Sequence, residues 1–65
     1  MYVKVEFGKL IRAKRIEKKM NQNELAKLAN LNRNYISDIE RGTRNISLEN
    51  IIKLFKVLSI EFHIK

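Results

Sequence analysis

The sequence contains no cysteine, which excludes disulfide bonds and thiolate metal sites. We expect the 65 residues to form a single domain, 1–65. A chain of this size buries only about 60% of the surface that it exposes when unfolded, so its own core is marginal. Small domains without cross-links often gain stability from a partner subunit. The lack of cysteine also fits the reducing cytoplasm, where we expect the protein to reside.

Long apolar runs are absent as well. Lysines interrupt the longest apolar stretch, IIKLFKVLSI (51–60), which is far shorter than the roughly 18 residues of a membrane helix. The first ten residues, MYVKVEFGKL, have neither an uninterrupted apolar region nor a small-residue cleavage site. The sequence therefore predicts no signal peptide and no membrane partner.

The residue types of an active site are scarce and badly placed. Ser37 and Asp38 are adjacent on one predicted helix, so their side chains diverge and cannot form a triad with His63. His63 is the only histidine and has no second candidate metal ligand. Proline is absent, and Gly8 and Gly42 form no phosphate-binding loop. We expect no enzyme activity, no cofactor, no metal and no small-molecule ligand.

What the sequence does have is an excess of positive charge. Fourteen Lys and Arg residues stand against seven Asp and Glu residues, for a net charge of +7. The excess lies in residues 1–20 (seven basic, two acidic) and 41–65 (five and two), whereas 21–40 hold two and three. Basic flanks of this kind favour a polyanionic partner, with nucleic acid first among them. A solvated surface without a partner, or a basic helix on a membrane surface, stays open.

The spacing of apolar residues predicts short helices over about 7–19, 22–29, 33–41 and 48–58. Asn and Ser mark their ends: Asn21 with Glu24 forms a capping box, and Asn32 and Ser47 cap the next helices. Gly42 suits the end of the third helix. Both termini, 1–7 and 59–65, alternate apolar and polar residues. They leave open a paired β-ribbon or a fifth helix, so the expected fold is an all-α or mainly α bundle.

The helices 22–29 and 33–41, joined by a three-residue break, are typical of a helix-turn-helix. Leu25 and Ala29 must share a core with Ile36 and Ile39, which turns the other face of 33–41 outward. That face carries Arg33, Asn34, Tyr35, Ser37, Asp38 and Arg41. A helix of this width fits the DNA major groove. The sequence therefore predicts that this helix recognises double-stranded DNA.

The side chains on this face suit base and phosphate contacts. Arg33 can donate two hydrogen bonds to guanine, and Asn34 can pair similarly with adenine. Asp38 can accept from cytosine or, as we favour, orient Arg41 or Arg33. The Tyr35 ring can contact a thymine methyl or a phosphate, or pack as a half-buried ring on the helix before it.

The run NQNELAKLANLNRNYISDIERGTRNISLENIIKLFKVL (21–58) resembles the helix-turn-helix domain of phage Cro and repressor proteins, the XRE type. The resemblance covers roughly residues 8–60 and implies a lambda-repressor-like DNA-binding domain. Within the family, YISDIERGTRNISLENI (35–51) is most similar to the controller proteins of restriction–modification systems. The residues that carry the resemblance are Gln22, Glu24, Leu25, Ala26, Ile36, Ile39, Glu40 and Gly42. Departures from the family pattern are Asn30, Ile46 and Ser59.

The resemblance implies a role for each matching position. Base-contacting or nearby groove positions are Asn32, Arg33, Asn34, Tyr35, Ser37 and Asp38. Phosphate-contacting positions are Gln22, Arg41, Thr43, Arg44, Asn45 and Ser47. A structural ion pair is implied between Arg15 and Glu40, which would tie the first helix to the recognition helix.

The sequence thus predicts a homodimeric transcriptional regulator that binds a pseudo-palindromic double-stranded DNA operator. RNA polymerase is a further candidate partner if the controller resemblance extends to activation. Two alternatives stay open. One is an antitoxin-like protein-interaction module with secondary DNA binding, and the other is a non-specific binder driven by charge.

Overall fold

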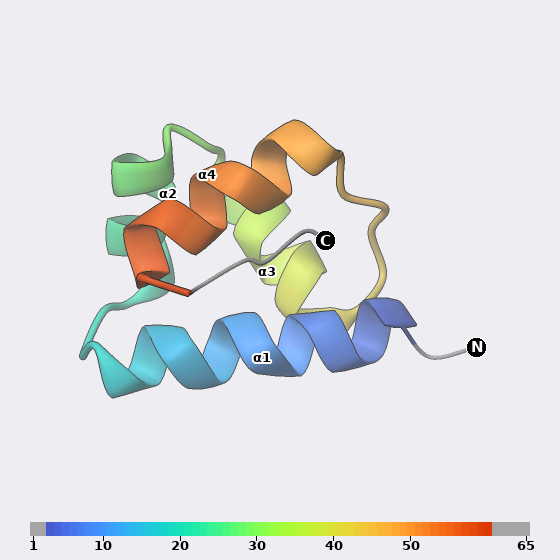
Figure 1. Cartoon of the computed structure of the whole chain (residues 1–65), viewed down its shortest axis with the longest axis horizontal. Helices are drawn as coiled ribbons and strands as arrows, with labels where there is room; N and C mark the ends of the chain where they lie inside the picture. Colours follow the sequence, from blue (N-terminus) through green and yellow to red (C-terminus); the bar gives the residue numbers. More distant parts are fainter. Residues whose placement is uncertain (1–2, 61–65) are drawn as a thin grey trace, which may run out of the picture.

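The computed structural model of the chain describes residues 3–60 and contains four helices within them. They are α1 (Val3–Glu17), α2 (Gln22–Ala29), α3 (Arg33–Arg41) and α4 (Leu48–Leu58). In Figure 1, α1 runs along the lower edge, α4 crosses above it, and α3 lies between them. Residues 3–60 form no strand, and the predicted all-α class is confirmed. Within the same residues, every helix is too short or too polar to serve as a membrane span.

The first helix differs from its expected bounds at both ends. It begins at Val3 rather than near Phe7, so the strand considered for residues 1–7 is wrong for residues 3–7. The physical reason is packing in and next to the added turn. Val5 lies against the end of α3, where a Cβ added at Gly42 would be 2.8 Å from Val5 Cα, and the Phe7 ring stacks on Phe55 of α4 with centroids 5.9 Å apart. The helix ends at Glu17, and Lys19 adopts a left-handed φ of 58°. The ribbon or fifth helix considered for 59–65 falls, from residue 61 onward, outside the described residues.

One apolar core joins all four helices. Six of its side chains are less than 2% exposed, and each such Leu or Ile stabilises the fold by about 1.5–3 kcal/mol relative to an exposed position. The predicted sharing of a core by α2 and α3 is confirmed. The buried residues are Ile11, Leu25, Ala26, Ala29, Ile36, Ile39, Leu54 and Leu58.

Local polar contacts fix the start of α2 and the break between α2 and α3. Asn21 Oδ1 accepts from the Glu24 backbone N–H at 2.8 Å, and the Asn21 N–H donates to the Glu24 carboxylate at 2.9 Å. This capping box confirms the predicted start of α2. Asn30 ends the helix with a φ of 56°, and Asn32 Oδ1 then caps α3 through the Asn34 N–H at 2.7 Å. Asn30 thus takes the left-handed conformation at the position where the resemblance expects glycine.

Two glycines bring α1 against α3. A Cβ atom added at Gly8 would lie 2.3 Å from the carbonyl oxygen of Ile39 and 2.9 Å from that of Glu40. Gly42 ends α3 with a φ of 75°, as predicted, and a Cβ there would lie 2.8 Å from Val5 Cα. The backbone of α1 thus touches the last turn of α3, and the orientation of α3 depends on this close approach.

Candidate nucleic-acid interface

The N-terminal turn of α3 presents free polar side chains. Arg33 and Asn34 are exposed, and Ser37 is partly exposed one turn later. Ile36 and Ile39 on the opposite side of the helix are buried. Among residues 3–60, no side chain pairs with the side chain of Arg33 or Asn34. These two groups are therefore available to a ligand outside the chain.

Asn32 has a structural task beside its predicted base contact. Its Oδ1 atom accepts from the Asn34 backbone N–H at 2.7 Å and so caps α3. Removing such a cap typically costs about 1 kcal/mol. The exposed amide nitrogen of Asn32 remains able to donate to a ligand.

Tyr35 connects α3 to the following loop and to α4. Its hydroxyl oxygen accepts from Asn50 Nδ2 at 3.0 Å, and the Arg44 guanidinium lies over its ring, 4.7 Å from the centroid. The ring is half-buried against the core. Sequence reasoning missed Asn50, because no sequence signal links two polar residues on separate helices. The contact holds the Tyr35 ring where α3 and the following loop meet.

Asp38 contacts several residues of the loop that follows α3 and holds it in place. Its carboxylate forms ion pairs with Arg41 and, at 3.2 Å, with Arg44 Nη1. The Thr43 backbone N–H and hydroxyl both donate to the Asp38 carbonyl oxygen, at 3.1 and 3.2 Å. Of the two arginines weighed from the sequence, Asp38 orients Arg41, whereas Arg44 takes the place considered for Arg33.

A bidentate ion pair joins α1 to α3. Arg15 Nε lies 2.7 Å from Glu40 Oε2, and Arg15 Nη2 donates to Oε1 at 3.0 Å. Arg15 Nη1 also donates to the Met20 carbonyl at 2.8 Å, and Gln22 Nε2 donates to Glu40 Oε1 at 3.2 Å. The hydrogen bond to Glu40 raises the pKa of Arg15, and this outweighs the lowering by burial. The start of α2 is therefore linked through one carboxylate to the last turn of α3.

A polar recess of about 290 Å³ opens beside this ion pair. It draws side chains from α1, α2 and α3, and three of them are arginines. Arg15 is paired with Glu40 and Arg41 with Asp38, so Arg12 is the arginine of this set best placed to hold an anionic oxygen group. Sequence reasoning missed Arg12, although it stands one helical turn before Arg15. The lining residues are Arg12, Arg15, Gln22, Ser37, Glu40 and Arg41.

The predicted phosphate positions fall on three segments. Gln22 begins α2, Ser47 caps α4, and the rest lie at or after the end of α3. The Ser47 hydroxyl oxygen accepts from the Asn50 N–H at 3.2 Å, which leaves its proton free to donate. Arg41, Thr43, Arg44 and Asn45 are all exposed. Among residues 3–60, no group of three or more His, Asp or Glu side chains could hold a metal ion.

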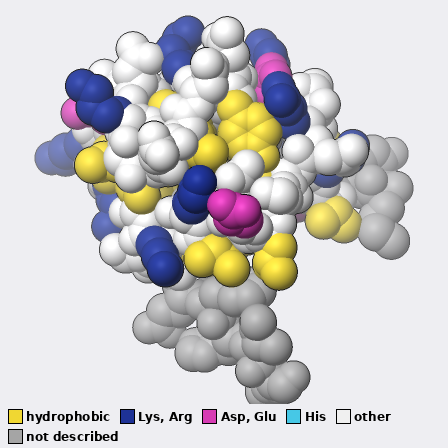
Figure 2. All heavy atoms as spheres, turned by 90° about the horizontal axis from the view of Figure 1, so that it is seen from above, with side chains coloured by type: hydrophobic (Ala, Val, Ile, Leu, Met, Phe, Trp, Pro, Cys, Tyr) yellow, Lys and Arg dark blue, Asp and Glu magenta, His cyan; other side chains and the backbone are white. Residues whose placement is uncertain are grey.

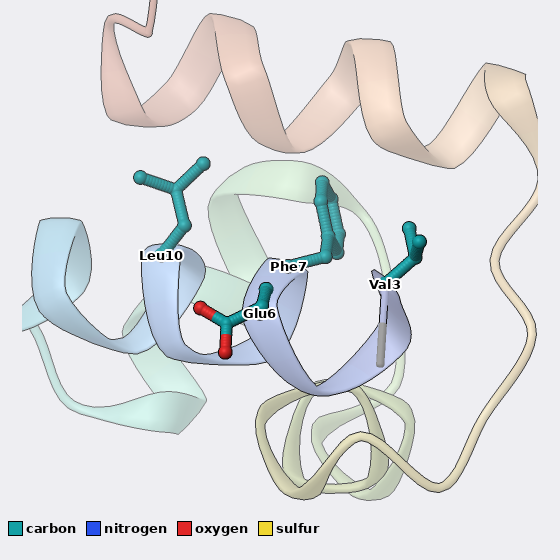
Figure 3. Close-up of a pocket in the computed structure, with 4 residues that line it drawn as sticks. All are labelled: Val3, Glu6, Phe7 and Leu10. Carbon is teal, nitrogen blue, oxygen red and sulfur yellow. The ribbon is translucent and has the colours of Figure 1, made fainter. Parts of the chain in front are cut away.

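Besides the polar recess, the surface has a groove lined mainly by apolar side chains. Figure 3 shows Val3, Phe7 and Leu10 pointing from α1 toward the side of α4, whereas Glu6 points away. These four residues line a space of about 500 Å³ that contains one carboxylate and no cation. In Figure 2, basic side chains are spread over the α4 side of the molecule and hydrophobic ones reach the surface between them. The groove suits apolar contacts rather than nucleic acid.

The sequence of the chain is similar to those of known helix-turn-helix proteins. The helix-turn-helix family model matches residues 11–64. The chain is 48% identical over 60 residues to control protein C.BamHI of Bacillus amyloliquefaciens, covering 91% of this chain and 74% of that protein.

Solved structures of controller proteins have the same fold as this chain. The restriction–modification controller protein C.AhdI from Aeromonas hydrophila superposes with a TM-score of 0.86 at 46% identity, covering 89% of this chain and 88% of that one. A variant of C.Esp1396I bound to its highest affinity operator site OM superposes with a TM-score of 0.86 at 33% identity, covering 94% and 80%. The chain therefore belongs to the helix-turn-helix family, and restriction–modification controller proteins are among its similar relatives, as the resemblance predicted.

Proposed function

We propose that the protein is a sequence-specific, double-stranded DNA-binding transcriptional regulator of the controller type. The observation that carries this proposal is the N-terminal turn of α3. There, Arg33 and Asn34 extend free donors and acceptors outward while Ile36 and Ile39 anchor the helix in the core. A helix held in this way enters the major groove with its leading side chains first.

Base contacts come from the outward face of α3. Arg33 pairs with guanine O6 and N7, and Asn34 pairs with an adenine edge. Asn32 donates through its free amide nitrogen, while Tyr35 and Ser37 lie nearby and contact the groove wall. Because phosphate contacts position a protein and base contacts specify the site, Arg33 and Asn34 are the residues on which sequence preference depends.

Phosphates are held around this face. The arginine-lined recess lies beside Gln22, so the start of α2 receives one phosphate there. The loop after α3 and the cap of α4 contact further phosphates through Thr43, Arg44, Asn45 and Ser47. Arg41 lies between the two regions, because it also lines the recess. The net charge of +7 supports this arrangement, since neutralised phosphates release counterions and favour binding.

The regulator acts as a homodimer in the cytoplasm. Two subunits would place their α3 helices about 34 Å apart, one turn of DNA, on a pseudo-palindromic operator. Large apolar side chains exposed on residues 3–60 support association of subunits, and they are Val3, Leu10, Ile16, Leu28, Leu48 and Ile52. Bound at its operator, the dimer either blocks RNA polymerase or contacts it to activate, often at its own gene.

Selection of bound duplexes from a random pool, followed by footprinting, tests the proposal. We expect enriched sites with two half-sites related by a twofold axis and centred about 10 base pairs apart. Light scattering of the complex should give two chains per duplex. A pool that stays random after several rounds would contradict sequence-specific binding, and one chain on an asymmetric site would contradict the dimer.

A further inference from the structure

Arg41, the last residue of α3, and Arg44, in the loop that follows, are not free, in contrast to Arg33. Both contact the carboxylate of Asp38: Arg41 at one oxygen and Arg44, at 3.2 Å, at the other. The side chain of Asp38 is 27% exposed, whereas those of Arg41 and Arg44 are 64% and 51% exposed. The carboxylate therefore lies behind the two guanidinium groups, and the cations form the outer layer.

Further contacts restrict Arg44. Its guanidinium lies 4.7 Å from the centroid of the Tyr35 ring, and Tyr35 is held by Asn50 at 3.0 Å. The backbone of the same loop is fixed because Thr43 donates twice to the Asp38 carbonyl oxygen. Stacking on an aromatic face adds to the ion pair in fixing the plane of an arginine. The position of Arg44 is thus determined from two sides.

By its charge alone, a carboxylate at this place lowers the affinity for DNA. Asp38 carries a negative charge toward a polyanion, and it holds two cations that would otherwise turn freely toward phosphates. Its benefit must therefore lie elsewhere than in the strength of binding. When Arg41 and Arg44 are held in one arrangement, their contribution to DNA affinity depends on where the phosphates lie.

We propose that Asp38 is a specificity-determining positioning residue, which restrains Arg41 and Arg44 so that both meet phosphates only on a correctly shaped duplex. This inference rests on the proposed DNA-binding function. On the operator, backbone phosphates lie where the restrained arginines point, and the ion pairs persist. On other DNA the phosphates lie elsewhere. The arginines then either stay paired with Asp38 and miss the phosphates, or give up the ion pairs to reach them, and both outcomes reduce the affinity.

The test replaces Asp38 with asparagine, which keeps the shape and removes the charge. Fluorescence anisotropy with a random duplex and with the selected operator, from 50 to 200 mM salt, gives both affinities. We expect Asp38→Asn to bind the random duplex about threefold to thirtyfold more tightly, the amount that two exposed ion pairs allow. Operator affinity should change less, so the ratio of the two falls. The salt dependence on random DNA should steepen by roughly one to two phosphate contacts per subunit.

Two control variants separate restraint from general charge. Glu17→Gln makes the same change in net charge at an exposed pair with Lys14, and we expect a change below about twofold. In a chain that already carries Arg41→Gln and Arg44→Gln, adding Asp38→Asn should no longer raise affinity for random DNA. An increase that persists in that chain, or that Glu17→Gln reproduces, overturns the proposal.

The remaining outcomes are also decisive. If Asp38→Asn binds the random duplex with unchanged affinity, the restraint is overturned. If Asp38→Asn instead loses its preference for the natural base pair at one operator position only, Asp38 contacts a base and the proposal is also overturned. If the unmodified protein prefers no duplex, the proposed function fails. The comparison on random DNA still tests Asp38 in that case, so the two failures can be told apart.

Discussion

Replacing Glu40 with glutamine removes the charge from the carboxylate that joins three helices. In the structure its two oxygens accept from Arg15 Nε at 2.7 Å, Arg15 Nη2 at 3.0 Å and Gln22 Nε2 at 3.2 Å. Glutamine offers one oxygen and an NH2 group in the same shape. Whichever way the amide turns, its NH2 group faces a donor of Arg15 or of both partners. At least one hydrogen bond is therefore lost.

The burial of the pair sets the magnitude. The side chain of Glu40 is 4% exposed and that of Arg15 12%, so water from the adjoining recess replaces the lost acceptor only in part. Removing one member of a buried ion pair costs about 3–5 kcal/mol, and a retained hydrogen bond returns about 1 kcal/mol. We therefore expect the free energy of unfolding to fall by about 2–4 kcal/mol. In a domain of this length the melting temperature should fall by about 10 °C or more.

Urea denaturation followed by circular dichroism measures the change. Glu17→Gln is the control, because its exposed pair with Lys14 should contribute under about 0.5 kcal/mol. Replacing Arg15 and Glu40 together with methionine should recover much of the loss, since no charge is then left buried without a partner. If Glu40→Gln unfolds at the same urea concentration as Glu17→Gln, the reasoning about the buried pair is refuted.

Other perturbations test the remaining parts of the account. Arg33→Ala should weaken operator binding by about 1–3 kcal/mol and relax the sequence preference in a gel-shift competition. An equal loss on random DNA would argue against a base contact. Arg12→Ala should weaken binding to both duplexes alike and lower the salt slope by about one, and a loss restricted to the operator would place Arg12 outside the phosphate recess. Gly8→Ala should destabilise the fold by about 1–3 kcal/mol in urea, although alanine favours helices by about 1 kcal/mol, because its Cβ would meet the Ile39 carbonyl. A more stable Gly8→Ala chain would contradict the close approach of α1 to α3. Raising salt from 50 to 200 mM should reduce binding about 10³- to 10⁵-fold if six to ten phosphates are contacted, and a flat salt profile would contradict the phosphate contacts.

The features predictable from the sequence are those decided by nearby residues. The bounds of α2 and α3 match the expectation, because each cap joins residues two or three apart, Asn21 with Glu24 and Asn32 with Asn34. Gly42 ends α3 for an equally local reason, a positive φ. The position of the exposed α3 face follows directly from these bounds and from the apolar spacing.

The features that escaped prediction depend on distant contacts. The first helix starts at Val3 because its apolar side chains pack against α3 and α4, which overrides the alternating pattern of residues 3–7. Gly8 marks a contact with the backbone of Ile39, far along the chain. The pairing of Asp38 with Arg44 depends on a loop that folds back onto α3. None of these contacts leaves a periodic signal in the sequence.

The central claim is that the leading turn of α3 touches bases, and an NMR titration with the selected operator tests it most directly. The account predicts that the backbone amides of residues 33–38 and the side-chain signals of Arg33 and Asn34 shift or broaden first and most. The backbone amide signals of Val3, Phe7 and Leu10, which line the apolar groove, should shift little on addition of DNA. Unchanged signals over 33–38 beside a response on another surface would contradict the account.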